Sequence, residues 1–160
     1  MEIHNIKPIF NSNSKILILG SFPSVKSRQE EFFYAHKQNR FWKVLSRVLN
    51  QQEPISIEEK KAFLLKNKIA LWDVISSCEI FGSSDSSIKK VKPNNLSIVL
   101  NNSQVNKIFV NGKTALKYYN KYILDAIKTE AECLPSTSPA NATFSLEKLV
   151  LHWQQILKFL

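Results

Sequence analysis

Short runs dominated by apolar residues recur along the chain and mark its most buried segments. Each run is four to seven residues long, which is short for a helix, and the first three lack strict alternation with polar residues. That pattern is typical of strands covered on both faces, as in parallel sheets. We therefore predict four strands, at residues 16–19, 69–75, 107–110 and 131–134.

Between these runs, apolar residues recur every three or four positions, which is the spacing of one face of an α-helix. Ser145 is placed to cap the last such segment, and Ser56 with Glu59 fits a capping box that opens a further helix. In addition to the helix that follows Ser56, we predict helices over residues 41–49, 96–100, 113–122 and 146–160.

Strands that alternate with amphipathic helices predict an α/β sandwich with a mostly parallel sheet. Ligands of such folds bind outside the carboxyl ends of the strands. Residues 76–94 are predicted to form a loop, and a loop of that length is often functional. The loops that would meet at the binding edge cover residues 21–39, 73–93, 111–113 and 135–141.

The chain length of 160 residues suits one domain over residues 1–160 with a substantial core. No apolar run reaches the ~18–20 residues that cross a bilayer. The N-terminus lacks the basic and apolar regions of a secretory signal. These observations predict a cytoplasmic protein of the bacterial type that is not secreted and makes no membrane contact.

Charge and metal-ligating residues narrow the class of partner. Lys and Arg number 22 against 13 acidic residues, a net charge of +9, which favours an anionic partner such as nucleic acid. The alternative is a lysine-rich composition without a binding role, since 19 of the 22 are Lys. Cys78 and Cys133 fit neither a disulfide framework nor a four-thiolate cluster, and with three histidines we expect no metal site.

Three segments carry candidate chemistry, and each has a structural alternative. Gly20–Ser24 would present backbone donors to a ligand, or form a tight turn after a strand. Phe32–Tyr34 would stack on a nucleobase or fill the core. Pro135–Pro139 would grip phosphates through hydroxyls and amides, or serve as an ordinary stiff connection.

Two single residues are also open to two interpretations. Asn39 precedes an apolar helix, so it is either an N-cap or an amide that orients water or reads a base. Asp73 ends a predicted strand at the binding edge, so it is either an acid or base, or the cap of the next turn. His36 and His152 are isolated in the sequence and receive no role.

These segments together resemble a known family, the uracil-DNA glycosylase superfamily, and within it the hypoxanthine-DNA (deoxyinosine) glycosylases. Residues 134–141, Leu-Pro-Ser-Thr-Ser-Pro-Ala-Asn, resemble the second motif of the superfamily. The resemblance covers roughly residues 14–155. Its other segments are Gly20–Ser24, Phe33–His36, Asn39–Trp42, Leu71–Val74, Ser77–Glu79, Gly82 and Asp85–Ser86.

The resemblance implies a three-layer α/β/α sandwich around a four-stranded parallel sheet. It also implies hydrolytic removal of a deaminated base without a metal or organic cofactor. The iron–sulfur branches need four cysteines, and this chain has two. Phe22 stands where the superfamily usually has its catalytic Asp or Asn, which lowers the expectation of uracil excision and places catalysis on Asn39. Tyr34 falls where an aromatic ring stacks on the flipped base.

The predicted site follows from this resemblance and from the chemistry. The glycosidic bond breaks toward an oxocarbenium-like sugar, so donors near the base stabilise the charge that grows on it. Asn39 cannot abstract a proton near neutral pH and is expected to position water or base. The catalytic residue is Asn39, the base-binding residues are Gly20, Ser21, Phe22, Pro23, Ser24, Tyr34 and Asn111, and the DNA-binding residues are Ser136, Thr137, Ser138, Pro139 and Asn141.

The function expected from the sequence is therefore a monomeric, monofunctional DNA glycosylase of base excision repair. Its substrate would be DNA containing a deaminated base, most simply hypoxanthine, which must leave the base stack before it can be cleaved. Two alternatives remain open at this point. One is a uracil or mismatch-specific glycosylase of the same fold, and the other is a DNA-binding module without catalytic activity.

Overall fold

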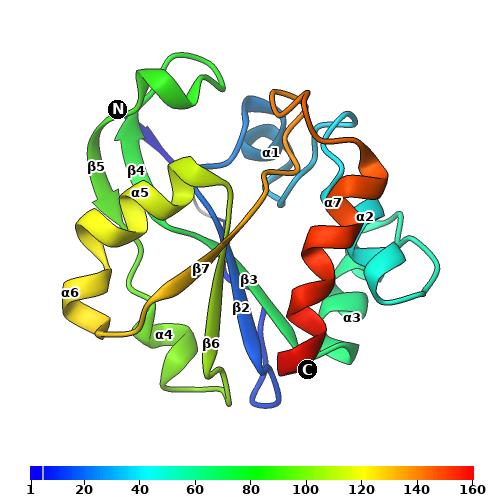
Figure 1. The fold of residues 1–160 in the computed structure, drawn as a ribbon. Coiled ribbons are helices and arrows are strands. Elements are labelled where there is room, and N and C mark those ends of the chain that lie inside the picture. Colours follow the sequence, from blue (N-terminus) through cyan, green and yellow to red (C-terminus); the bar gives the residue numbers. More distant parts are fainter. Residues whose placement is uncertain (5) are drawn as a thin grey trace.

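A four-stranded parallel sheet forms the centre of the computed structural model, which describes residues 1–4 and 6–160 (Figure 1). The strand order is β3-β2-β6-β7, and each neighbouring pair runs parallel. All residues of β2 and β3 are buried, which explains their continuous apolar sequences. The strands are β2 (Ile16–Gly20), β3 (Ile69–Asp73), β6 (Lys107–Asn111) and β7 (Ala131–Leu134).

Helices cover both faces of this sheet, so the predicted α/β fold is confirmed (Figure 1). On one side α2 packs against α7 while α3 packs against β3, and on the other side α5 packs against β6 and β7. The helices are α1 (Val25–Glu30), α2 (Phe41–Val48), α3 (Ile57–Lys66), α4 (Ser97–Leu100), α5 (Lys113–Tyr122), α6 (Leu124–Ile127) and α7 (Leu146–Trp153).

The ends of several helices follow local rules. The capping box of Ser56 and Glu59 is present at α3, and the Ser145 hydroxyl accepts a hydrogen bond from Lys148 N at α7, as predicted. The last predicted helix is shorter than expected, because α7 gives way to the 3₁₀ helix η2 (Gln154–Phe159). The short helix α1 was not predicted, since its sequence shows no apolar periodicity.

A second, antiparallel sheet of three strands corrects the prediction of a loop over residues 76–94. Its order is β1-β4-β5, formed by β1 (Glu2–Ile3), β4 (Ile75–Glu79) and β5 (Lys89–Pro93). The predicted strand 69–75 is in fact two strands, which separate after Asp73. β5 is an exposed edge strand made of Lys, Val and Pro, a composition that protects an edge from further pairing and hides the strand from pattern analysis.

The four parallel strands end at one edge, where the binding loops begin. Gly20 pairs in register with Asp73, and Asn111 pairs with Leu134. The loops after these residues therefore emerge side by side at the top of Figure 1. Within the described parts of the chain, no helix has the length and apolar character needed to cross a membrane.

Candidate functional site

A pocket of about 510 Å³ opens at the carboxyl ends of the parallel strands. Its volume lies in the range of small-molecule sites, which run to ~300–1,000 Å³. The lining includes every residue predicted to act in catalysis, base binding or DNA binding, except Asn141. It also includes Ser27, Phe33, His36, Asp73, Ser83, Ser84, Asp85, Ser86 and Ala140.

Gly20 lines the pocket, and the close approach of two side chains requires a glycine at this position. A Cβ atom at this position would lie 2.5 Å from Asp73 Oδ1 and 2.9 Å from the Tyr34 hydroxyl oxygen. Both distances are too short for a real Cβ contact, so any larger residue would displace Asp73 or Tyr34. The turn continues into α1, where the Ser24 hydroxyl accepts a hydrogen bond from Ser27 N at 3.2 Å.

The aromatic cluster divides between core and pocket. Phe32 is core at 4% exposure, whereas Phe33, only 2% exposed, also lines the pocket. Tyr34 stacks on Phe41 with ring centroids 4.1 Å apart, so that one face of its ring is covered. Its hydroxyl is buried without a hydrogen-bond partner among the described residues. Burial, together with the nearby Asp73 carboxyl, raises the pKa of Tyr34 well above its ordinary value, so the phenol stays neutral.

The Asn39 side chain makes a cap-like hydrogen bond at the start of α2 and also lines the pocket. Its Oδ1 accepts hydrogen bonds from Phe41 N at 3.0 Å and from the Thr137 hydroxyl at 2.9 Å. The N-cap position of α2 is nevertheless Arg40, which makes no side-chain cap. Because two donors occupy Oδ1, the orientation of the amide is fixed, and Nδ2 is the hydrogen-bond donor that this pocket-lining side chain can offer to a ligand.

Asn111 and Thr137, which are distant from Asn39 in the sequence, form a hydrogen-bond network that holds Asn39 in place. Thr137 is fully buried, its hydroxyl accepts a hydrogen bond from Asn111 Nδ2 at 3.0 Å, and its backbone N donates to Asn111 Oδ1 at 3.1 Å. Both the oxygen and the nitrogen of the Asn111 amide therefore bind this loop. The network joins β6, the loop after β7 and the loop before α2 into one unit.

The loop at residues 135–141 is held in one shape by its own hydrogen bonds and by Arg40. Ser138 N donates to Ser136 Oγ at 3.1 Å, and Asn141 Nδ2 donates to Ser136 O at 3.0 Å. The Arg40 guanidinium donates to the carbonyl oxygens of Ser138 at 3.3 Å, Asn141 at 3.1 Å and Phe144. The loop is thus preorganised, with Pro139 exposed near its tip.

Comparison with known proteins decides the family. A model of the uracil DNA glycosylase superfamily matches residues 8–159. The chain belongs to this superfamily. It is therefore a DNA glycosylase by family, which makes DNA its expected substrate.

Individual relatives agree with this assignment over 94% or more of their lengths. A hypoxanthine DNA glycosylase of Methanosarcina barkeri is 31% identical over 160 residues, with 99% of each chain covered. A second, from Methanosarcina acetivorans, is 30% identical over 152 residues, with 94% of each covered. A solution NMR structure of a candidate uracil DNA glycosylase from Methanosarcina acetivorans matches with a TM-score of 0.80 and 28% identity, covering 98% of this chain and 99% of that one.

The glycosylase pocket also contains a buried carboxyl group, that of Asp73, which is 4% exposed. Asp73 does not cap the next turn, because its carboxyl makes no hydrogen bond with the described residues; only its backbone carbonyl accepts one, from Asn94. Burial raises the pKa of Asp73 to about 7. The carboxyl can therefore exist in the neutral form close to physiological pH.

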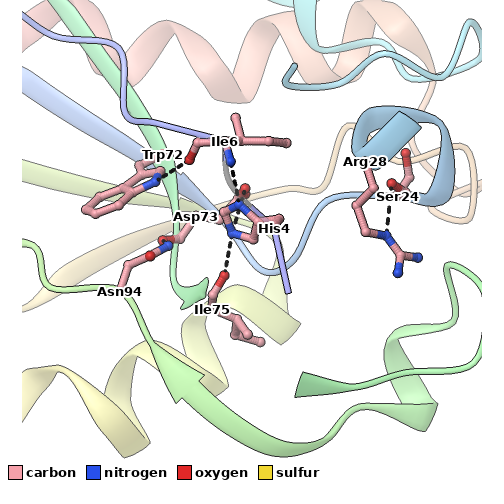
Figure 2. Close-up of polar contacts among 8 residues, drawn as sticks. All are labelled: His4, Ile6, Ser24, Arg28, Trp72, Asp73, Ile75 and Asn94. Carbon is pink, nitrogen blue, oxygen red and sulfur yellow. Dashed lines mark hydrogen bonds and ion pairs between the residues drawn. The ribbon is translucent and has the colours of Figure 1, made fainter. Parts of the chain in front are cut away.

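His4 is the neighbour of Asp73 that sequence reasoning missed. Its Nε2 donates to Ile75 O at 2.7 Å, its Nδ1 accepts from Ile6 N at 3.2 Å, and Nε2 lies 4.0 Å from Asp73 Oδ2 (Figure 2). Burial lowers the pKa of His4. The two hydrogen bonds thus fix a neutral imidazole with its proton on Nε2. No pattern in the sequence links His4 to Asp73. Asp73 itself could be singled out, because it is a charged residue inside the apolar run 69–75.

Phe22 is both a buried residue and part of the pocket lining. Its ring is 8% exposed, packs edge-on against the His4 ring at 5.4 Å and lies under the Arg28 guanidinium at 5.3 Å. It lines the glycosylase pocket as an apolar wall and offers no hydrogen bond there. Among the described residues, no group of three or more His, Cys, Asp and Glu side chains is placed to hold a metal ion.

Proposed function

We propose that residues 1–160 form a monofunctional DNA glycosylase that removes hypoxanthine from DNA by hydrolysis of the N-glycosidic bond. The observation that carries the proposal is the Asn39 amide, which two hydrogen bonds to Oδ1 hold in place in the lining of a pocket large enough for a purine. The names of the two hypoxanthine DNA glycosylases that resemble this chain support the choice of base.

Access to the bond requires that the damaged nucleotide leave the helix and enter the pocket, at a cost of a few kcal/mol. The loop at residues 135–141 is held in one shape by its own hydrogen bonds, so it is suited to hold the distorted DNA strand. In this scheme the DNA backbone would lie against Ser136, Ser138, Pro139 and Asn141. Thr137 points inward and braces Asn39. The net charge of +9 supplies attraction to phosphates.

Asn39 acts in this scheme as a donor to the departing base. Its Oδ1 already accepts two hydrogen bonds, so it is poorly placed to hold a nucleophilic water as well. Its Nδ2 would instead stabilise the negative charge that develops on the base as the C1′–N9 bond lengthens. A single oriented donor of this kind is worth ~10²–10³-fold in rate.

Single-turnover cleavage of duplexes carrying one hypoxanthine, uracil or xanthine, beside an undamaged duplex, tests the proposal. We expect hypoxanthine to be released fastest and the undamaged duplex to remain intact. Faster release of uracil would contradict the choice of base. Tight binding of every duplex without cleavage of any would contradict enzymatic activity and favour a DNA-binding module.

A further inference from the structure

Two buried polar atoms in the described part of the chain lack a hydrogen-bond partner, and both belong to residues that line the pocket. They are the Tyr34 hydroxyl oxygen and Asp73 Oδ2. Both side chains approach Gly20 within a distance that excludes any other residue there. Buried polar groups nearly always have partners, so two orphans at one site indicate a ligand that contacts this part of the floor.

Among the described residues, no cationic side chain is placed to keep Asp73 ionised. Two titratable groups face it, His4 from the N-terminal segment and Tyr34 from the loop before α2, and both are held neutral. The nearby Arg28 is engaged elsewhere, with Glu2 at 3.3 Å and with the carbonyl oxygen of Gly82 at 2.6 Å. A buried carboxylate without a counter-ion or hydrogen bonds is costly, so the neutral acid is the stable form. The raised pKa of Asp73, caused by burial, is consistent with this.

We propose that Asp73 is the general acid of base release: its neutral carboxyl donates a proton to the departing purine. The inference rests on the proposed hypoxanthine glycosylase function. Sheet order places Asp73 at the end of β3 and the Asn111–Thr137–Asn39 brace beyond β2, so a base above Gly20 would lie between the two.

The proton step balances without a further reactant. The electrons of the C1′–N9 bond move onto the base while N7 takes the Asp73 proton, which gives a neutral purine. Water adds to C1′ of the oxocarbenium-like sugar and loses a proton to solvent, and the Asp73 carboxylate regains a proton from solvent. The sum is one water consumed, one free base and one sugar hydroxyl. General acids of this kind contribute ~10²–10⁴-fold, most effectively when their pKa lies near the working pH.

This device distinguishes purines from pyrimidines. N7 belongs to the five-membered ring of a purine, and uracil has no corresponding atom. Proton transfer from Asp73 would therefore accelerate release of hypoxanthine more than release of uracil. Asn39, which can donate to a carbonyl oxygen or ring nitrogen of either base, carries no such preference.

The experiment measures single-turnover cleavage of hypoxanthine and 7-deazahypoxanthine duplexes between about pH 5.5 and 8.5, a range that spans the acid's ionisation. The proteins are the wild type, Asp73→Asn, and Asp125→Asn as a control on the exposed surface of α6. We expect the wild-type rate on hypoxanthine to fall about tenfold per pH unit above pH 7. Asp73→Asn should be about 10²-fold slower at pH 6 and insensitive to pH. On the 7-deaza base the two proteins should cleave at equal rates, because the proton acceptor is missing.

Several outcomes would overturn the assignment. A wild-type rate that is flat with pH, or an Asp73→Asn rate on hypoxanthine that equals wild type at pH 6, would do so. An Asp73→Asn variant whose rate falls equally on hypoxanthine and on 7-deazahypoxanthine would also overturn it. His36 also lines the pocket, so His36→Gln is measured alongside, and loss of pH dependence in that variant alone would assign the titration to His36. If neither protein cleaves the 7-deaza base, the two pH profiles on hypoxanthine decide. Failure of the wild type to release hypoxanthine at any pH would instead refute the proposed function itself.

Discussion

Replacing Thr137 by valine tests whether the bracing of Asn39 matters for base excision. Valine has nearly the same shape as threonine, but it cannot donate to Asn39 Oδ1 at 2.9 Å or accept from Asn111 Nδ2 at 3.0 Å. Thr137 is fully buried, so water cannot replace the lost hydroxyl without repacking. Each buried hydrogen bond is worth about 1 kcal/mol, so the variant should lose roughly 2 kcal/mol of stability and stay folded.

The effect on catalysis should exceed the effect on stability. With Phe41 N as the partner that remains for Oδ1, the Asn39 amide can rotate, and Nδ2 is no longer held in one direction. Misplacement of a catalytic group by about 1 Å costs ~10²-fold, so we expect a single-turnover rate lowered by ~10–10²-fold with DNA affinity preserved. Single-turnover cleavage and duplex binding are measured on the same preparations, beside melting curves.

Thr137→Ser is the matched control. Serine keeps the hydroxyl that bridges Asn39 and Asn111 and loses one buried methyl group, which costs about 1 kcal/mol of stability. Its cleavage rate should remain near wild type while its melting temperature falls toward that of Thr137→Val. A Thr137→Val enzyme that cleaves at the wild-type rate would refute the bracing argument, and so would a Thr137→Ser enzyme as slow as Thr137→Val.

Four further predictions address the same pocket and its surroundings. Asn39→Asp keeps the acceptor used by Phe41 and Thr137 but removes the Nδ2 donor, so it should be folded and at least ~10²-fold slower on hypoxanthine; a wild-type rate would remove Asn39 from the mechanism. Ser138→Ala should weaken productive DNA binding by ~1.5–3 kcal/mol in a titration, with nearly unchanged melting, if this hydroxyl contacts phosphate. Affinity for an abasic-site duplex should fall with salt at a log–log slope of about −0.9 per phosphate neutralised, and a flat response would show that the lysines only face solvent. Because the pKa of Asp73 is raised from 3.8 to about 7, the folded state holds the extra proton, so this residue lowers stability as pH rises across that window; Asp73→Asn should therefore melt higher than wild type at pH 8 and gain little at pH 4.

The parallel sheet was readable from sequence because buried parallel strands are almost wholly apolar, as Ile16–Leu19 shows. The antiparallel sheet was not readable for the opposite reason. β5 consists of three lysines around Val91 and ends in Pro93, and β1 spans only Glu2 and Ile3. Such strands exist because β4 offers them an edge, which is information held by the fold and absent from the local pattern.

The site residues that could be predicted lie in contiguous segments, and those that could not are brought together by the fold. The Gly20 turn and the loop at residues 135–141 are contiguous segments, so their residue types indicated chemistry before their positions were known. The partners of Asn39 could not be inferred, because Thr137 is 98 positions away. Arg40 was missed because its role is to hold carbonyl oxygens of a distant loop. His4 was missed because it reaches Asp73 through the pairing of β1 with β4.

The two sides of the pocket differ in how completely their buried polar groups are hydrogen-bonded. On the β6 and β7 side, Asn39, Asn111 and Thr137 hydrogen-bond to one another, so that side is held in place before substrate arrives. On the β3 side, Asp73 and Tyr34 are buried and incompletely satisfied around Gly20, an arrangement that lowers stability. Sites that break the rule of satisfied buried groups are expected where function requires it. A base placed between these walls would meet a fixed donor on one side and an acid in need of a partner on the other, and this asymmetry is suited to a leaving group that takes up both a hydrogen bond and a proton.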